Sequence, residues 1–341
     1  MSLAGTANLV RLHTAGFEGL IFVIGPLLTG WHATAAGMMC LWWIGVLVNG
    51  YIFALNDVVD LPHDRANPAR SHSPLVNGSV SYRAALGLAV VLPLLATTLV
   101  IAARWPAGAA TTFVLMLALG AATNIYQKVT HHPVLMDLLY ATTMAAPLPV
   151  TAQAYSNTTT PLLWSSTVTL FLLALQLNSI AGNLKDLRSD QSTGFRTIAV
   201  SLGAHLREDH TLIAGNRYRT YCWTVQAGVS IAAGVTVSLA VAGRGQGTIT
   251  CVAVTSGVVL AVGTWDLWRL LSGRRQPSRT GREYYFASGF ALLIVAVGLR
   301  SAPAPFWAVL AAVASWEVLA RHFWNMHRRR TRLVADTASG K

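Results

Sequence analysis

The sequence is poor in charged residues and in cysteine, and each shortage excludes a class of protein. Charged residues make up 11% of the 341 residues and hydrophobic residues 53%, a ratio far from that of a soluble globular domain. The three cysteines, Cys40, Cys222 and Cys251, lie far apart inside apolar segments, which excludes a disulfide framework and a clustered metal site. The N-terminus lacks a basic region followed by a small-residue cleavage site, so we expect no removable signal peptide.

Apolar stretches near the length that spans a bilayer recur along the whole chain. This pattern predicts an all-α, polytopic membrane helical bundle. Ten candidate spans cover residues 12–30, 34–56, 82–103, 107–126, 133–153, 161–182, 220–242, 247–271, 284–301 and 303–324.

The positive charges are distributed unevenly between alternate loops, and the net charge is +12. With ten spans, one side of the membrane receives nearly all Lys and Arg residues, including the Arg328–Arg332 cluster. The other side receives only Arg104, Arg244 and Arg300. This asymmetry is the positive-inside pattern, so we expect both termini in the cytoplasm. The basic excess then indicates topology and attraction to anionic membrane lipids, not nucleic-acid binding.

Carboxylates are the scarcest charge: the chain has 13 Asp and Glu residues, and five of them occur in two short motifs. Asp57, Asp60 and Asp64 are spaced i, i+3 and i+7, and Asp186 and Asp190 are spaced i, i+4. On helices each set shares one face. Carboxylates at the ends of membrane helices are costly and indicate function. Their hard oxygen atoms suit Mg²⁺ ions that also hold a phosphate group.

The chain also resembles itself across two halves. Asp60-Leu61-Pro62-His63-Asp64 matches Asp186-Leu187-Arg188-Ser189-Asp190, and each motif follows an even-numbered span. Residues 12–126 and 133–271 are therefore predicted to form two four-helix halves in parallel repetition, which brings corresponding loops to one side. The longest polar stretch, 183–219, is long enough to cover a cytoplasmic pocket. The basic and then small polar tail, 327–341, is predicted to be disordered.

These residues carry a resemblance to a known family. Asn56-Asp57-x-x-Asp60-x-x-x-Asp64 is followed by Asn67, Arg70, Pro74, Leu75 and Gly78, and Asp186-x-x-x-Asp190 leads into Gly194, Thr197 and Gly203. The sequence thus resembles the UbiA superfamily of intramembrane prenyltransferases. The resemblance implies one domain over 1–326, with nine to ten transmembrane helices around a central cavity beneath a cytoplasmic cap. We expect the protein in the plasma membrane, with the active site facing the cytoplasm because the positive-inside pattern puts both acidic motifs on that side.

The sequence departs from the family pattern at three points. Ser73 stands where the family commonly has a phosphate-binding Arg, and Arg70 is our candidate replacement. After the fourth span, Lys128 is nearer to Tyr126 than the family's cation is to its Tyr. The family usually has nine spans, whereas charge parity here favours ten. Arg70 and Lys128 also have an alternative interpretation as topology charges only.

The resemblance implies Mg²⁺-dependent transfer of a prenyl group from an isoprenoid diphosphate to a lipophilic, aromatic-type acceptor, through an allylic carbocation. A membrane terpene cyclase is the alternative, because it needs the same site, and an anion or metal transporter is a remote one. The catalytic and metal-binding residues implied are Asp57, Asp60, Asp64, Asp186 and Asp190. Those implied for the diphosphate are Asn56, Arg70, Lys128, Asn183, Lys185 and Arg188. Candidate cavity residues are Tyr51, Phe53, Tyr126, Asp137 and Tyr140.

Overall fold

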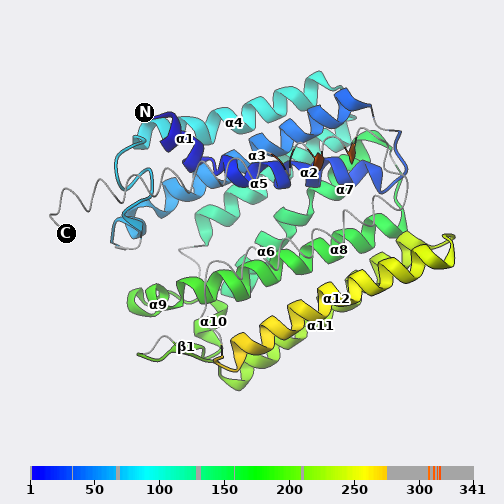
Figure 1. Cartoon of the computed structure of the whole chain (residues 1–341). Coiled ribbons are helices and arrows are strands. Elements are labelled where there is room, and N and C mark those ends of the chain that lie inside the picture. The colour runs from blue at the N-terminus through cyan, green and yellow to red at the C-terminus, as the bar shows by residue number, and fades with distance from the viewer. Residues whose placement is uncertain are drawn as a thin grey trace. The chain divides into compact units, whose positions relative to one another are not determined.

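The computed structural model describes residues 2–32, 34–66, 70–127, 132–156, 158–208 and 211–274, together with a few isolated positions between 306 and 315. These residues form helices joined by short connections and one small hairpin (Figure 1). They fall into two compact units. Unit 1 comprises Met1–Val23, His32–Trp105 and Pro303–Lys341, and unit 2 comprises Ile24–Trp31 and Pro106–Ala302.

Unit 1 is built on the long helix α3 (Ala35–Ala66), which packs against α4 (Tyr82–Ala102) and against α1 (Leu3–Leu9). Helix α2 (Leu12–Leu27) begins in this unit and follows α1 after a bend of 43°. Ser81 caps α4, because its side chain accepts a hydrogen bond from the backbone N–H of Ala84. The core between α1, α3 and α4 consists of small and aliphatic side chains: Leu9, Ala54, Val58, Leu61, Leu75, Val80, Ala85 and Ala89.

Helices α2 and α3 approach each other closely at two glycines. A Cβ atom on Gly45 would lie 2.7 Å from the Cα of Gly19, and one on Gly19 would lie 2.8 Å from the carbonyl oxygen of Trp42. The Trp42 indole N–H also donates to the carbonyl of Gly16 at 3.0 Å. Small residues permit this contact between backbones, as is common where membrane helices associate.

Unit 2 contains the remaining elements. Its first helices are α5 (Ala107–Tyr126), α6 (Pro133–Ala145), α7 (Pro147–Tyr155) and α8 (Pro161–Gln176). The π-helix η2 (Leu177–Gly182), α9 (Asn183–Thr193) and α10 (Ile198–Ser201) follow, and then a two-stranded hairpin of β1 (His205–Leu206) and β2 (Leu212–Ile213). The last two helices are α11 (Asn216–Val241) and α12 (Gln246–Leu271). Helix α8 packs against α6 and α11, and α11 against α12. The polar stretch 183–219 thus folds as α9, α10 and the hairpin. Its role as a cap stays a prediction.

Seven described helices are long and apolar enough to cross a membrane, or eight if the bent pair α1–α2 forms one span. The prediction of an all-α, polytopic membrane bundle is confirmed, and these helices coincide with the first eight predicted spans. The ninth predicted span, 284–301, lies outside the described residues, as does most of the tenth. The count of nine to ten therefore stays a prediction.

Candidate functional site

The first acidic motif lies on the C-terminal part of α3. Because α3 continues to Ala66, Asp57, Asp60 and Asp64 share one helix face, and each residue is at most 9% exposed. The intervening Pro62 and His63 are exposed. Carboxylates are rarely buried unless they are paired, so their partners define the site.

Each of the three carboxylates contacts a different polar group. Asp60 Oδ2 accepts a hydrogen bond of 3.1 Å from Asn56 Nδ2. Asp64 Oδ1 lies 3.5 Å from Arg70 Nε. Asp57 Oδ1 lies 3.7 Å from a guanidinium nitrogen of Arg11. The structure therefore places two residues predicted to bind diphosphate, Asn56 and Arg70, beside carboxylates predicted to bind metal. It adds Arg11, which the sequence analysis treated only as a topology charge.

Arg11 lies at the break between α1 and α2, with a positive φ of 47°, which is uncommon for a residue other than glycine. Its guanidinium also lies 3.9 Å from the centre of the Phe53 ring, a cation–π distance. Phe53 and Asp57 are one turn apart on α3, so Arg11 contacts this helix at two points. A lone arginine just before the first apolar span was the only sequence signal for this contact.

Arg70 and Ser73 occupy one tight turn after α3. The Ser73 backbone N–H donates to the Arg70 carbonyl at 2.8 Å, and Ser73 is buried while Arg70 reaches Asp64. The hypothesis that Arg70 replaces an arginine at position 73 requires these two residues to be close, and they are. Asn67, which belongs to the same motif, lies outside the described residues.

The second motif lies on α9, which continues the line of α8 through η2 (Figure 1). Lys185 Nζ lies 3.2 Å from Asp186 Oδ2, and the Asp186 side chain is 42% exposed. Arg188 is exposed. The Asp190 carbonyl accepts from the Phe195 N–H at 2.8 Å, after α9 ends at Gly194 in a left-handed conformation (φ 74°) that favours glycine.

Both motifs lie toward the C-terminal ends of unusually long helical segments. Ala35–Ala66 and Pro161–Ser192 each contain 32 residues, or about 48 Å of helix at about 1.5 Å per residue. The hydrocarbon core of a bilayer is only about 30 Å thick. The polar C-terminal part of each segment can therefore lie in the headgroup region, where a carboxylate costs much less than it does at the bilayer centre.

Unit 2 has a buried polar cluster of its own around Asp137. It lies on α6 and is 4% exposed. Its Oδ1 accepts a hydrogen bond of 2.6 Å from Asn178 Nδ2 on η2. Asp137 Oδ2 and Asn183 Nδ2 are also buried, and the Asn183 side chain is a second hydrogen-bonding neighbour of the Asp137 carboxylate. Next to Asn178, the Ser179 hydroxyl accepts from the Tyr221 hydroxyl at 2.8 Å.

The other predicted cavity and diphosphate residues have varied surroundings. Tyr51 is buried on α3, Tyr126 is exposed at the end of α5, and Tyr140 packs partly buried against the core of unit 2. Lys128 lies outside the described residues. Sequence reasoning did not single out Asn178, Ser179 or Tyr221, because their role depends on contacts between helices far apart in the chain.

The donor groups fit Mg²⁺ held jointly with a phosphate, but not an all-protein metal cage. Among the described residues, no three His, Cys, Asp or Glu side chains converge closely enough to hold a metal by themselves. Mg²⁺ commonly takes only one or two carboxylates and completes its shell with water and substrate phosphate. The buried carboxylates of α3 suit this arrangement.

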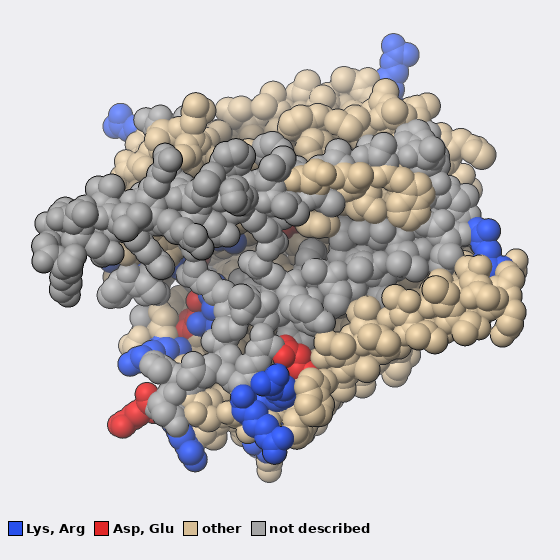
Figure 2. Space-filling view, viewed as in Figure 1, with Lys and Arg blue, Asp and Glu red and all other residues tan. Residues whose placement is uncertain are grey.

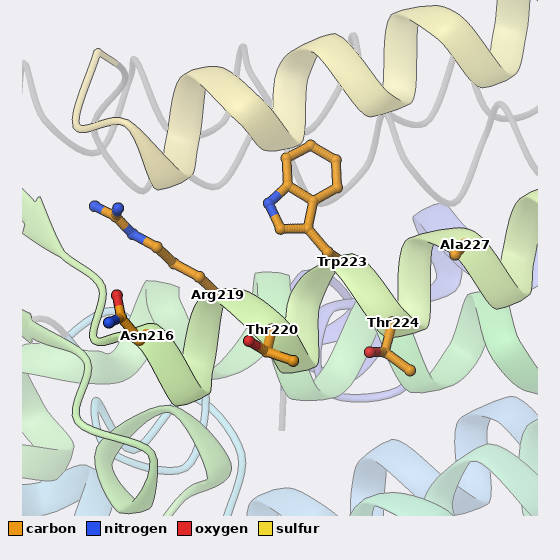
Figure 3. Close-up of a pocket in the computed structure, with 6 residues that line it drawn as sticks. All are labelled: Asn216, Arg219, Thr220, Trp223, Thr224 and Ala227. Carbon is orange, nitrogen blue, oxygen red and sulfur yellow. The ribbon is translucent and has the colours of Figure 1, made fainter.

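A shallow groove of about 570 Å³ follows one face of α11, lined by Asn216, Arg219, Thr220, Trp223, Thr224 and Ala227 (Figure 3). It contains none of the predicted site residues. Trp223 is partly exposed there, as expected of a tryptophan near a membrane interface. Arg217 and Arg219 lie in the first turn of α11 and Arg269 in the last turn of α12. Figure 2 shows Lys and Arg side chains near the end of the α11–α12 helix pair where α11 begins and α12 ends, and β1 lies at the same end.

The long apolar helices indicate an integral membrane protein, and two of the long helical segments carry acidic motifs toward their C-terminal ends. The chain belongs to the UbiA prenyltransferase family, whose model matches residues 19–288. The resemblance seen in the sequence is thereby confirmed. No curated protein sequence matches the chain.

Solved structures of UbiA homologues share the fold. The apo homologue from Aeropyrum pernix K1 is 20% identical, with a TM-score of 0.59 over 84% of this chain and 96% of its own. The Archaeoglobus fulgidus homologue bound to DMAPP and Mg²⁺ is 14% identical, with a TM-score of 0.62 over 87% and 99%. A digeranylgeranylglyceryl phosphate synthase is 15% identical, with a TM-score of 0.52 over 92% and 98%.

Proposed function

We propose that the protein transfers a prenyl group from an isoprenoid diphosphate to a lipophilic acceptor, in an Mg²⁺-dependent reaction. The observation that carries the proposal is the pair of acidic motifs, each on the polar end of a 32-residue helical segment and each with a cation beside a carboxylate. A homologue of similar fold has been solved with DMAPP and Mg²⁺, which supports this substrate class.

Asp57, Asp60, Asp64, Asp186 and Asp190 would hold the metal. When bound, Mg²⁺ neutralises the charge that grows on the departing diphosphate. Asn56 orients Asp60 through their hydrogen bond, and Arg11 holds Asp57. Arg70, Asn183, Lys185, Arg188 and Lys128 bind diphosphate oxygens, because charge-assisted hydrogen bonds to phosphate are strong.

The chain must also protect an allylic cation from water. We propose that side chains lining an apolar cavity do this. The candidates are Tyr51 and Phe53 on α3, Tyr126 at the end of α5, and Asp137 and Tyr140 on α6. Aromatic faces attract cations, and the Phe53 ring already contacts the Arg11 guanidinium. The acceptor in this proposal is an aromatic or similar lipophilic nucleophile.

We also propose where the protein lies in the cell and how its chain is divided. Residues 1–326 act as one domain in the plasma membrane, with both motifs at the cytoplasmic face and 327–341 as a basic tail. Within the α11–α12 hairpin, arginines are concentrated near the start of α11 and the end of α12, while Arg244 lies in the connecting loop. This arrangement supports a cytoplasmic location for the arginine-rich end.

The test is turnover by the purified full chain in nanodiscs, with Mg²⁺ and a series of prenyl diphosphates beginning with DMAPP. We expect Mg²⁺-dependent diphosphate release that rises when a phenolic acceptor is added, and a prenylated product. Diphosphate release without an acceptor, together with a cyclic hydrocarbon product, would replace the transferase with a terpene cyclase. The absence of turnover with every donor would reopen the transporter alternative.

A further inference from the structure

We infer that Asp137 is a positioning residue that clamps the π-helical turn η2 and thereby sets the direction in which the second acidic motif faces. This inference rests on the proposed function, because it assigns a task to a residue outside the two motifs. Asp137 lies on α6, whereas the motif that it serves follows η2 on α9.

The turn η2 determines the orientation of α9. A π-helical turn contains more residues than an α-helical turn, and the Asn183 N–H accordingly reaches back five residues to the Asn178 carbonyl. Each residue of an α-helix advances the side chains by about 100° around the axis. If η2 relaxed to α-helical geometry by one residue, Asp186 and Asp190 would rotate by about 100°, which is enough to move them to another face.

Two neighbouring helices hold η2 from different sides. From α6, Asp137 accepts the 2.6 Å hydrogen bond of Asn178. From α11, Tyr221 donates to the Ser179 hydroxyl at 2.8 Å, and Ser179 in turn donates to the Leu175 carbonyl at 2.6 Å. These bonds connect consecutive residues of η2 to α6 and α11. In an apolar core, a lost hydrogen bond leaves a buried polar group unsatisfied, so the clamp favours the π-helical geometry.

The sequence of η2 suits this geometry. Gly182 lies close to the turn, because an added Cβ would be a tight 3.3 Å from the Leu177 carbonyl oxygen and in ordinary contact, 3.5 Å, with Asn178 Oδ1. The side chain of the next residue, Asn183, has a buried Nδ2 atom and is a second hydrogen-bonding neighbour of the Asp137 carboxylate. Asn183 is also the first residue of the second motif, so the residues that hold η2 are directly followed by those proposed to bind the diphosphate.

The experiment compares Asp137→Leu with Asp137→Asn. The asparagine keeps an oxygen that can accept from Asn178 and removes the negative charge, whereas leucine removes both. Thr236→Val is the matched control, because it breaks the buried 3.0 Å Thr169–Thr236 bond between α8 and α11 away from η2. Each full-length variant, in nanodiscs with Mg²⁺, is titrated with DMAPP by calorimetry. Hydrogen exchange of residues 177–193 is followed by mass spectrometry.

We expect Asp137→Leu to weaken DMAPP binding at least tenfold and to accelerate exchange at 177–193. Asp137→Asn should stay within about threefold of the wild type, and Thr236→Val should leave both readouts unchanged. Equal binding and exchange in Asp137→Leu and the wild type would overturn the inference. So would an equal loss in both Asp137 variants, because the carboxylate charge would then act directly. If the wild-type chain binds no DMAPP, the proposed function fails, and the exchange data alone decide whether the clamp exists.

Discussion

Arg11, Asn56 and Arg70 each hold one carboxylate of α3. The charges of the motif also act on one another, since Arg70, Asp60 and Asp64 all influence Asp57 in addition to Arg11. Single substitutions in the motif therefore test the site as a whole, because each charge influences its neighbours.

We predict that Asp60→Ala and Asp186→Ala each reduce turnover to below a tenth of the wild-type rate, while the protein still purifies as a folded species. The loss of a metal ligand from a preorganised site removes transition-state stabilisation, and a tenfold loss corresponds to about 1.4 kcal/mol. The measurement is product formation at saturating Mg²⁺. Glu208→Ala is the control, because Glu208 is an exposed carboxylate outside the motifs. A variant of either motif that kept more than a tenth of the rate would contradict the site assignment.

Arg70 should contribute specifically to use of the diphosphate donor. We expect Arg70→Ala to lower kcat/KM for the prenyl diphosphate by about 2 kcal/mol. Arg70→Lys should lower it less, because lysine supplies a charge without the bidentate geometry of arginine. Arg83→Ala, which removes an exposed arginine of α4, provides the matched control.

The double variant Arg70→Ala with Ser73→Arg should recover part of the loss, because both positions lie in one turn. An unchanged kcat/KM in Arg70→Ala would show that Arg70 only sets topology.

Among individual residues, the sequence indicated site candidates that are rare in the chain. It did not indicate residues whose importance comes from tertiary contacts. Five aspartates stood out because the chain has so few carboxylates. Arg11 and Tyr221 belong to common classes, arginine near a membrane face and tyrosine in a span. Only the folded chain shows that Arg11 contacts Asp57 and that Tyr221 bonds to Ser179.

Among the elements, the contact between α2 and α3 depends on missing side chains. We predict that Gly45→Ala lowers thermal stability, because the new Cβ would lie 2.7 Å from the backbone of Gly19. Overpacking of this kind costs about 1–3 kcal/mol, which exceeds the gain in helix propensity of up to about 1 kcal/mol. Gly87→Ala on α4 is the control, since nothing lies within 4 Å of its added Cβ.

Thermal unfolding monitored by size-exclusion chromatography in detergent would measure both glycine variants. Gly87→Ala should match or exceed the wild type. Equal or greater stability of Gly45→Ala would mean that the α2–α3 contact is looser than the structure indicates.

The elements were predictable where they are long and apolar, because hydrophobicity over a bilayer length is a strong signal. Eight predicted spans therefore coincide with helices or with the bent pair α1–α2. The π-turn in residues 177–182 was not predictable, since it differs from an α-helix by its hydrogen-bond register and not by composition. The bend between α1 and α2 depends on the positive φ of Arg11, which the sequence does not indicate.

At the scale of the whole molecule, the charge distribution predicts that both termini are cytoplasmic. A cysteine placed in the Arg328–Arg332 tail, in a chain whose native cysteines are replaced, should react with a membrane-impermeant maleimide only after permeabilisation. A cysteine at exposed Gly247, at the start of α12, is the control and should react in intact cells. Labelling of the tail in intact cells would favour nine spans and contradict the parity argument.

The two 32-residue segments that carry the motifs connect the chemistry to bilayer thickness. Each is about 18 Å longer than a hydrocarbon core of about 30 Å. A thicker bilayer would draw the carboxylate-bearing turns toward hydrocarbon or force the helices to tilt. Turnover in vesicles should therefore fall as the acyl chains lengthen from fourteen to twenty-two carbons, at constant headgroup. Lipid composition would then act on this protein as a control of activity, through the depth at which its acidic turns lie.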